Sequence, residues 1–228
     1  MVEKLIALEA AVTVFDINVA GLDELRQLRE LNCVECDVSN YDQVRKATAA
    51  YHDEFGAADV LINNAGILYS APLVKITSSG IEQHNVAMWN KVLETDLSSV
   101  FYMTVCVVEK MIATRAKGVI VNIGSVSASG SAGASAYSAA KAGVNALTAA
   151  WAKELGPLGI RVVAVAPGFT ETASTRAAMS EAALGDTIKR VPLRRLGKPE
   201  EIAEGVVAVI LNDFFNGKVF ELDGGLIV

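Results

Sequence analysis

Three polar residues have the types and spacing for proton transfer to or from an oxygen atom: Ser125, Tyr137 and Lys141. Tyr137 and Lys141 lie four residues apart in YSAAK, at the start of a predicted helix, so they share one helical face. A free tyrosine has a pKa of about 10 and transfers protons poorly at neutral pH. Because a neighbouring ammonium group favours the phenolate, we expect Lys141 to lower the pKa of Tyr137.

Ser125 follows a predicted strand whose end would lie beside the start of this helix. Its hydroxyl could donate a hydrogen bond to a substrate carbonyl and stabilise charge that develops on the oxygen. Taken alone, YSAAK also fits a plain helix face with a partly buried tyrosine and a lysine whose stem covers apolar surface. The elements that position these residues therefore decide between the two interpretations.

Short apolar segments alternate with helix-length segments along the chain. Most of the apolar segments are continuous runs of Val, Ile and Leu, which is typical of parallel strands covered on both faces. The predicted strands are 11–15, 33–36, 59–62, 118–123, 160–166 and 218–222, and the predicted helices are 42–55, 88–113, 137–155 and 199–211. This alternation predicts an α/β fold, a doubly wound parallel sheet of the Rossmann type, with residues 1–228 as a single domain.

Small and polar residues follow the predicted strands again and again. In such a sheet, ligands bind beyond the carboxyl ends of the strands. The residues at these positions are Asp16, Asp37 and Val38, the segment 63–66, Gly124 and Ser125, and the segment 167–170. The sequence therefore predicts a ligand site along one edge of the sheet.

The composition is that of a soluble protein. The 228 residues are 52% hydrophobic and carry a formal net charge of −6, with no basic stripe that would bind phosphates. No apolar run approaches the roughly 18 residues of a membrane span, and the start of the sequence does not fit a signal peptide. We therefore expect a cytoplasmic protein with neither nucleic-acid nor membrane partners.

Cysteine and histidine residues give little sign of a metal site. Cys33 and Cys36 form a CxxC pair, but they lie in a predicted strand, and no second cysteine pair completes a zinc site. We interpret both as core residues and expect no metal. His52 and His84 stand alone in polar surroundings, and we predict that both are solvated surface residues.

Several motifs in a fixed order resemble those of the short-chain dehydrogenase/reductase family. They are NNAG at 63–66, GS at 124–125, YSAAK at 137–141, PGFTET at 167–172, PLRRLGKPEEIA at 192–203 and FELDGG at 220–225. The resemblance extends from about residue 5 to the C-terminus. It implies an oxidoreductase that interconverts a secondary alcohol and a ketone on a small molecule, with a nicotinamide cofactor.

The resemblance also implies roles for individual residues. Tyr137 would be the general acid in reduction and the base in oxidation, Lys141 would bind the nicotinamide ribose and tune Tyr137, and Ser125 would orient the carbonyl. The cofactor-binding residues would be Asn64, Ala65 and Gly66 on the adenosine side, Asp37 and Val38 near the adenine, and Pro167, Gly168, Thr170 and Thr172 around the nicotinamide and pyrophosphate. Asp16 closes a strand, where a carboxylate accepts hydrogen bonds from the adenosine ribose and repels a 2′-phosphate. NAD(H) is therefore favoured over NADP(H), although Asp16 could also simply cap or solvate the strand end.

The sequence departs from the family pattern at the fourth catalytic position. The family usually carries an asparagine there, which helps to hold a water molecule in a proton relay to the lysine, whereas this chain has Asp96 in LETDLSSVF. An ionised aspartate only accepts hydrogen bonds, whereas asparagine also donates them. Near Lys141, Asp96 could pair with the ammonium and still order water, or its pairing could keep the lysine from acting in the proton relay. We expect an altered proton relay.

The opening residues depart from the pattern as well. A dinucleotide-binding unit places its acidic residue about 20 residues after a glycine-rich loop, and counting back from Asp16 passes the first residue. Residues 1–8 match the later turns of the helix that this loop begins, with Glu9 at the position that is usually glycine at the helix end. The absent strand would lie in the middle of the sheet, between the strands that carry Asp16 and Asn63.

Three explanations of this opening are open. In the first, which we favour, the sequence belongs to a longer protein. In the second, the chain is this short and fills the gap by rearrangement or by strand exchange in an oligomer. In the third, the chain is a non-catalytic relative that keeps the rest of the fold for assembly. The alternative function is thus a scaffold or oligomer subunit that cannot bind cofactor normally.

Similar chains include 3-oxoacyl thioester reductases, hydroxysteroid dehydrogenases and sugar or polyol dehydrogenases, and a 3-oxoacyl reductase-like activity is preferred. We expect a flap at 170–190 to cover the substrate. We also expect a homo-oligomer, a dimer or tetramer, whose interfaces are formed by helices 88–115 and 137–155.

Overall fold

The computed structural model describes residues 1–25, 31–172, 175–176 and 180–226. Its central element is a four-stranded parallel sheet in the order β3-β6-β7-β8, formed by Val60–Asn63, Gly118–Ile123, Ile160–Pro167 and Val219–Leu222. A second parallel pair consists of β1 (Val12–Asp16) and β2 (Leu31–Glu35). All six strands were predicted to within two residues at each end, and all of them pair in parallel. The predicted α/β fold with a doubly wound parallel sheet is confirmed.

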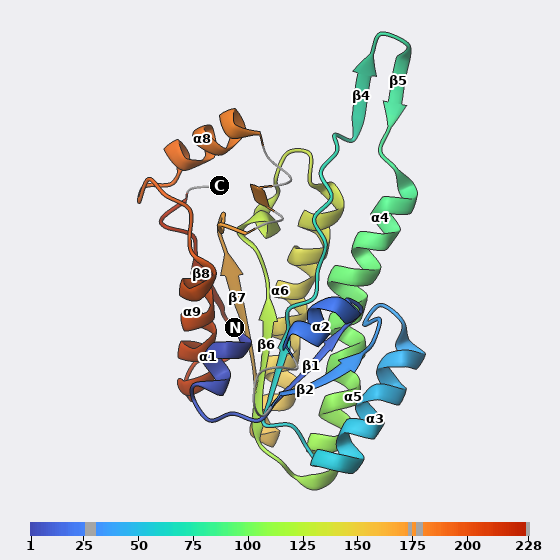
Figure 1. Cartoon of the computed structure of the whole chain (residues 1–228), viewed down its shortest axis with the longest axis vertical. Coiled ribbons are helices and arrows are strands. Elements are labelled where there is room, and N and C mark those ends of the chain that lie inside the picture. Colours follow the sequence, from blue (N-terminus) through green and yellow to red (C-terminus); the bar gives the residue numbers. More distant parts are fainter. Residues whose placement is uncertain (26–30, 173–174, 177–179, 227–228) are drawn as a thin grey trace.

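The helices lie on both faces of the central sheet (Figure 1). They are α1 (Val2–Ile6), α2 (Val19–Leu25), α3 (Tyr41–Phe55), α4 (Val86–Leu93), α5 (Ser99–Thr114), α6 (Ser135–Leu155), α8 (Glu181–Arg190) and α9 (Pro199–Leu211). On β6 and β7, Ile120 and Val162 point toward a core shared with α3, α5 and α6, whereas Val121 and Val163 pack with Val206 of α9. This alternation explains the continuous apolar runs, because both faces of each strand are buried.

The two parallel sheets are not hydrogen-bonded to each other. Among the described residues, β1 pairs only with β2, and β3 pairs only with β6. The order is therefore interrupted between β1 and β3, as the sequence predicted. Phe15 of β1 and Val34 of β2 nevertheless pack against the core that contains Val44 and Met103, so the pair is tied to the domain through side chains.

Glu9 adopts a left-handed backbone conformation just after α1, with φ of 61°. The amide N–H groups of Glu9 and Ala10 donate to the carbonyl groups of Ile6 and Leu5 and close the helix end. Glycine is the usual residue in this conformation because it has no Cβ. The prediction that Glu9 occupies a glycine position at the end of a helix is confirmed.

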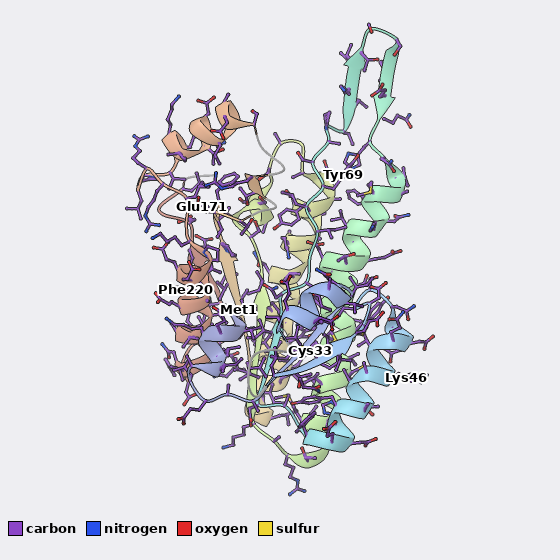
Figure 2. The ribbon with its side chains drawn as sticks, in the orientation of Figure 1. Met1, Cys33, Lys46, Tyr69, Glu171 and Phe220 are labelled. Carbon is purple, nitrogen blue, oxygen red and sulfur yellow. The ribbon has the colours of Figure 1, made fainter. Side chains whose placement is uncertain are left out.

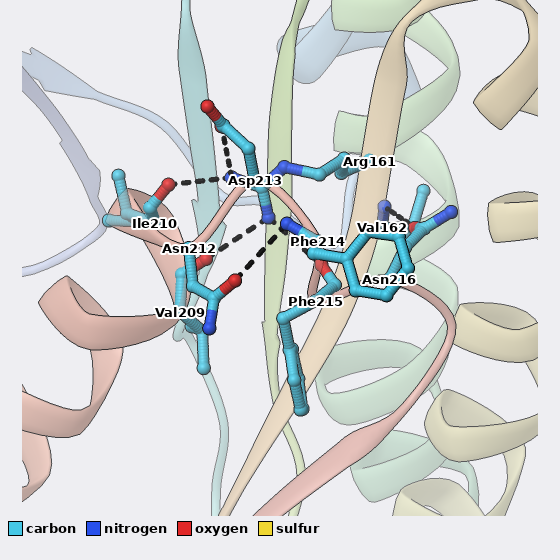
Figure 3. A network of polar contacts seen from close by, with 9 residues as sticks. All are labelled: Arg161, Val162, Val209, Ile210, Asn212, Asp213, Phe214, Phe215 and Asn216. Atoms are coloured by element: carbon cyan, nitrogen blue, oxygen red, sulfur yellow. Dashed lines mark hydrogen bonds and ion pairs between the residues drawn. The ribbon is translucent and has the colours of Figure 1, made fainter.

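One partly buried cation joins the end of α9 to the sheet (Figure 3). Arg161 of β7 donates hydrogen bonds to the carbonyl oxygens of Val209, Ile210 and Phe215, at 3.0, 2.6 and 3.0 Å. Its side chain is 14% exposed, and the carboxylate of Asp213 lies 3.6 Å from Nη2. A cation at a helix C-terminus satisfies carbonyl groups that lack intrahelical partners and interacts favourably with the helix dipole.

The run α4, the π-helix η1 (Glu94–Ser98) and α5 forms one continuous helix over Val86–Thr114. By length and composition alone it could cross a membrane, although no such run stood out in the sequence. The buried core helix of a soluble protein passes the same test, so the finding is weak evidence for a membrane span. Val100, Met103, Val107 and Met111 are buried in this structure.

The segment between β3 and α4 holds an element that the sequence analysis did not predict. β4 (Val74–Thr77) and β5 (Gly80–Gln83) form an antiparallel hairpin that projects from the domain (Figure 1). Among the described residues, its strands pair with no other strand.

The histidine predictions need correction, whereas the cysteine prediction largely holds. His52 is only 8% exposed, and its Nδ1 lies 2.8 Å from the carbonyl oxygen of Gly56, because α3 packs this face against α5. His84 is half-buried against the ring of Tyr69, with centroids 5.4 Å apart. Cys36 is buried in the core, as predicted, and Cys33 is partly buried on β2.

Candidate active site

The structure brings Ser125, Tyr137 and Lys141 together at the end of β6. Ser125 follows the strand and caps a 3₁₀ turn, its Oγ accepting a hydrogen bond from the amide of Ser127 at 3.1 Å. Ser125 is close enough to Tyr137 for its hydroxyl to lower the pKa of that residue, and Lys141 lies one turn further along α6. The ammonium of Lys141 is 5.6 Å from the centroid of the Tyr137 ring. The predicted geometry is therefore present.

Lys141 is held by a backbone carbonyl and a buried carboxylate. Its Nζ donates a hydrogen bond to the carbonyl oxygen of Ile123 at 2.9 Å and lies 3.6 Å from Oδ2 of Asp96. The side chains of Lys141 and Asp96 are only 5% and 0% exposed. Burial lowers the pKa of Lys141, and the charge of Asp96 partly opposes this effect. Asp96 therefore forms a buried ion pair with the Lys141 ammonium.

Asp96 lies in the π-helix η1, where the helix between α4 and α5 widens for one turn. Such bulges often occur at functional sites. Its Oδ1 accepts a hydrogen bond from the amide of Ile67 at 2.8 Å, which ties η1 to the loop after β3. Burial raises the pKa of the Asp96 carboxyl, while Lys141 and the Ile67 amide act in the opposite direction. Asp96 thus links the NNAG loop to the lysine.

The pKa of Tyr137 shifts in the direction opposite to our prediction. Burial raises it first, the charge of Asp96 raises it further, and only the hydrogen bond from Ser125 lowers it. The prediction considered the Lys141 ammonium alone. The structure places a carboxylate beside that ammonium, which offsets the positive charge that Tyr137 would otherwise sense.

Apart from Tyr137 and Lys141 on α6, the residues predicted to contact the cofactor lie at the carboxyl ends of four strands, β1, β2, β3 and β7. Asn64, Ala65 and Gly66 follow β3 and are exposed. A Cβ on Gly66 would lie 2.9 Å from Oδ2 of Asp96, so a larger residue would displace the carboxylate or the loop. Gly168 follows β7, and a Cβ there would lie 2.7 Å from Cα of Asp223. Both glycines let the backbone approach the catalytic residues or the C-terminal turn closely.

The predicted adenosine-binding residues lie at the ends of β1 and β2. Asp16 is exposed, and its Oδ1 accepts a hydrogen bond from the amide of Asn18 at 2.9 Å. Asp37 accepts hydrogen bonds from the amide and hydroxyl of Ser39 at 2.9 and 2.6 Å, and Val38 packs on the core. The ends of the two strands are adjacent, since the amide of Cys36 donates to the carbonyl of Asp16. No described contact joins this group to Ser125 or Tyr137.

The segment after β7 lies alongside the end of β6. Thr170 donates a hydrogen bond to the carbonyl of Gly168 at 3.2 Å, and Thr172 bonds to Thr175 through their hydroxyls at 2.9 Å. Pro167 ends β7, which pairs with β6 as far as Ile123, two residues before Ser125. Of the predicted flap at 170–190, residues 173–174 and 177–179 lie outside the described residues, and the remainder includes α8.

A buried polar network beneath the site escaped the sequence analysis. Asn63 donates hydrogen bonds to Thr104 and Asn122, at 3.1 and 2.8 Å, and Asn122 donates to Thr148 at 2.9 Å. The four side chains are at most 8% exposed and connect α5, β3, β6 and α6. Because Asn122 directly precedes Ile123, this network fixes the strand end that holds Lys141. Asparagines inside two apolar strand runs were the signal that could have revealed it.

Comparisons with known proteins agree with this geometry. A family model described as enoyl-(acyl carrier protein) reductase matches residues 1–227. The chain is 37% identical to a 3-oxoacyl-[acyl-carrier-protein] reductase FabG of Thermotoga maritima over 227 residues, which cover 96% of this chain and 88% of that one. It is likewise 37% identical to the FabG protein of Chlamydia muridarum over 193 residues, 83% of this chain and 74% of the relative.

A solved structure shares the fold as well. The crystal structure of a putative gluconate dehydrogenase from Agrobacterium tumefaciens superposes with a TM-score of 0.84, at 28% identity, over 95% of this chain and 86% of that chain. The matches extend over nearly the whole chain, and the motifs that carry the predicted resemblance lie within them. The chain belongs to the short-chain dehydrogenase/reductase family of oxidoreductases.

Proposed function

We propose that this chain reduces the ketone of a 3-oxoacyl thioester to a secondary alcohol, with a nicotinamide cofactor as reductant and with NAD(H) favoured over NADP(H). The observation that carries the proposal is that Ser125, Tyr137 and the buried Lys141 come together at the end of β6, with the ammonium 5.6 Å from the centroid of the Tyr137 ring. The names of the FabG relatives support the substrate class.

The exposed residues at the strand ends fit a dinucleotide. Asp16 is exposed, so its carboxylate can accept hydrogen bonds from a ribose. Asn64, Ala65 and Gly66 are exposed on the loop whose next residue, Ile67, donates a hydrogen bond to Asp96 beside the lysine. Lys141 would hold the nicotinamide ribose, and Pro167, Gly168, Thr170 and Thr172 would line the nicotinamide side. When bound, the reduced cofactor supplies the hydride that the carbonyl carbon accepts.

In the proposed reaction, the Ser125 hydroxyl donates a hydrogen bond to the substrate carbonyl and the Tyr137 hydroxyl transfers its proton to the same oxygen. The hydride on carbon and the proton on oxygen together give the alcohol. Lys141 stabilises the phenolate that remains, and Asp96 limits that stabilisation because it shares the ammonium charge. Tyr137 then recovers its proton from solvent, with the Lys141 and Asp96 pair ordering the route.

The proposed assembly is a homo-oligomer, a dimer or tetramer, in the cytoplasm. Phe101, Val105 and Ile112 lie on α5 and are exposed to 48%, 40% and 45%, although they are apolar. Exposed apolar residues in one stripe are typical of a subunit interface. Alanines 139, 142, 146 and 150 form an exposed stripe along α6, where a partner helix could approach closely.

A second candidate function is an assembly subunit without turnover. It is favoured by the interruption between β1 and β3, which separates the proposed adenosine residues from the catalytic group. Titration of the purified protein with NADH and NADPH, followed by nicotinamide fluorescence, distinguishes the two. We expect saturable binding with NADH tighter than NADPH, and a loss of that preference in Asp16→Ala. No saturable binding of either nucleotide would instead support the assembly subunit.

A further inference from the structure

The hairpin of β4 and β5 has one apolar face and one charged face. Its register pairs Ile76 with Ile81, Val74 with Gln83 and Lys75 with Glu82. Since side chains alternate along a strand, Val74, Ile76 and Ile81 share one face with the uncharged Gln83, and Lys75 and Glu82 share the other. We name the first surface the arm face: Val74, Ile76 and Ile81, with Leu73 and Val86 at its base.

The arm face is open to solvent in the single chain. Ile76 is 85% exposed, Ile81 73% and Val86 69%, and the hairpin stands clear of the domain with its side chains projecting on both sides (Figure 2). At its base, Leu73, Val74, Val86 and Trp89 line an open cavity of about 460 Å³ together with Gln83 and His84. A two-stranded hairpin without further packing is marginally stable in water. We therefore expect an apolar surface of a partner to cover the arm face.

We infer that the partner is the arm face of a second copy of this chain, packed about a twofold axis. The arm continues directly into α4, η1 and α5, the helix that carries the exposed stripe of Phe101, Val105 and Ile112. The two apolar surfaces are thus neighbours along the chain, and we place both at the contact with the second copy. This inference rests on the homo-oligomer proposed above.

Charge and hydrogen bonding agree with a second copy as the partner. Each chain carries a formal net charge of −6, so two copies repel unless their contact surfaces are uncharged. The arm face carries no charged residue, and the two charges of the hairpin, Lys75 and Glu82, are opposite and lie on the other face. In addition, β4 and β5 each have one free edge in the described residues, which offers backbone groups to another strand.

The contact is isologous, so the same residues meet on both sides of the axis. The segment that leads into the arm contacts the elements of the candidate active site. The amide of Ala71 donates to the carbonyl of Gly133 at 2.7 Å, and Tyr69 packs in the cluster that contains Tyr137. An arm held by a partner would therefore fix residues 67–85, the segment that connects the NNAG loop to α4 beside the candidate active site.

Two variants of the full chain, which introduce opposite charges on the arm face, test whether the partner is a second copy. The first variant carries Ile76→Lys and Ile81→Lys, the second carries Ile76→Glu and Ile81→Glu, and association is measured by sedimentation equilibrium. Each variant alone should raise the dissociation constant of the arm contact by about tenfold to a hundredfold. An equimolar mixture of the two should associate again, because opposite charges then face each other.

The matched control is Glu82→Lys, which changes the charge by the same two units on the opposite face. It should leave association unchanged, and far-UV circular dichroism should show that every variant stays folded. Unchanged association in the Ile76 and Ile81 variants, no recovery in the mixture, or a wild-type chain that is monomeric throughout would overturn the inference. Phe101→Glu distinguishes the arm contact from the proposed oligomer interface on α5. If this variant disrupts the oligomer while the arm variants do not, the α5 interface is supported and the arm contact is contradicted.

Discussion

Asp96 and Lys141 form an ion pair beneath the candidate active site, with Oδ2 and Nζ 3.6 Å apart and neither side chain more than 5% exposed. The same carboxylate receives the Ile67 amide and faces Gly66, so one side chain joins the NNAG loop to the lysine. The ammonium that would favour the Tyr137 phenolate is therefore already shared with an anion. This relationship determines the expected pH dependence of the enzyme.

Asp96→Asn should lower the pKa of Tyr137 and raise turnover at neutral pH. In alcohol oxidation Tyr137 acts as a base, so the rate rises with pH as the phenolate forms. Burial and the charge of Asp96 both raise the pKa of Tyr137, so removing that charge should shift the rising limb of the kcat–pH profile to lower pH. Glu94→Gln, in the same π-helix but exposed, is the control. An unshifted profile with equal or lower turnover would contradict this account.

Gly66→Ala should disturb the same pair from the opposite side. Its Cβ would lie 2.9 Å from Oδ2 of Asp96, closer than real Cβ contacts, so the carboxylate or the loop must move. Misplacement of a catalytic group by a fraction of an ångström can reduce kcat by on the order of tenfold or more. Gly156→Ala, where the nearest atom is 3.4 Å away, is the matched control. Equal steady-state kcat in Gly66→Ala and wild type would show that the approach to Asp96 is unimportant.

Thr148→Val should destabilise the fold through the network beneath the site. The substitution keeps the shape of the side chain but removes the oxygen that accepts the Asn122 Nδ2–H. A buried donor without a partner costs about 1–3 kcal/mol. Thermal unfolding should show this loss, while Thr148→Ser, which retains the hydroxyl, should lose less. A larger loss in Thr148→Ser than in Thr148→Val would mean that the methyl group, not the hydrogen bond, stabilises this region.

The strands were predictable because their apolar runs record burial on both faces, which is a local property of the sequence. The Ser125, Tyr137 and Lys141 group was predictable because YSAAK fixes two of its members on one turn. The burial of His52 was not, since it depends on how α3 packs against α5. The shift in the pKa of Tyr137 also depends on tertiary structure, because Asp96 reaches Lys141 from a different helix. The hairpin escaped because its strands are only four residues long and mostly exposed.

Glu201→Gln should remove a contribution to stability that the wild-type protein has at neutral pH and loses in acid. Arg195 binds the Glu201 carboxylate through two hydrogen bonds of 2.6 Å, and these lower its pKa from 4.5 to about 2. Stability from this group is complete above pH 4.5 and is lost as the pH falls toward 2, because the unfolded chain binds the proton first. The variant should therefore unfold at lower temperature at neutral pH, with a smaller difference from wild type near pH 2. A difference that stays constant over this range would contradict the assignment.

The most direct test of the central claim is NADH-dependent reduction of a 3-oxoacyl thioester, followed by the loss of NADH absorbance. The account predicts saturable turnover by the wild-type chain, and a loss of about 10²–10⁴-fold in Tyr137→Phe, which keeps the ring but lacks the transferable proton. Turnover that is undiminished in Tyr137→Phe, or no NADH-dependent reduction by wild type, would contradict the account.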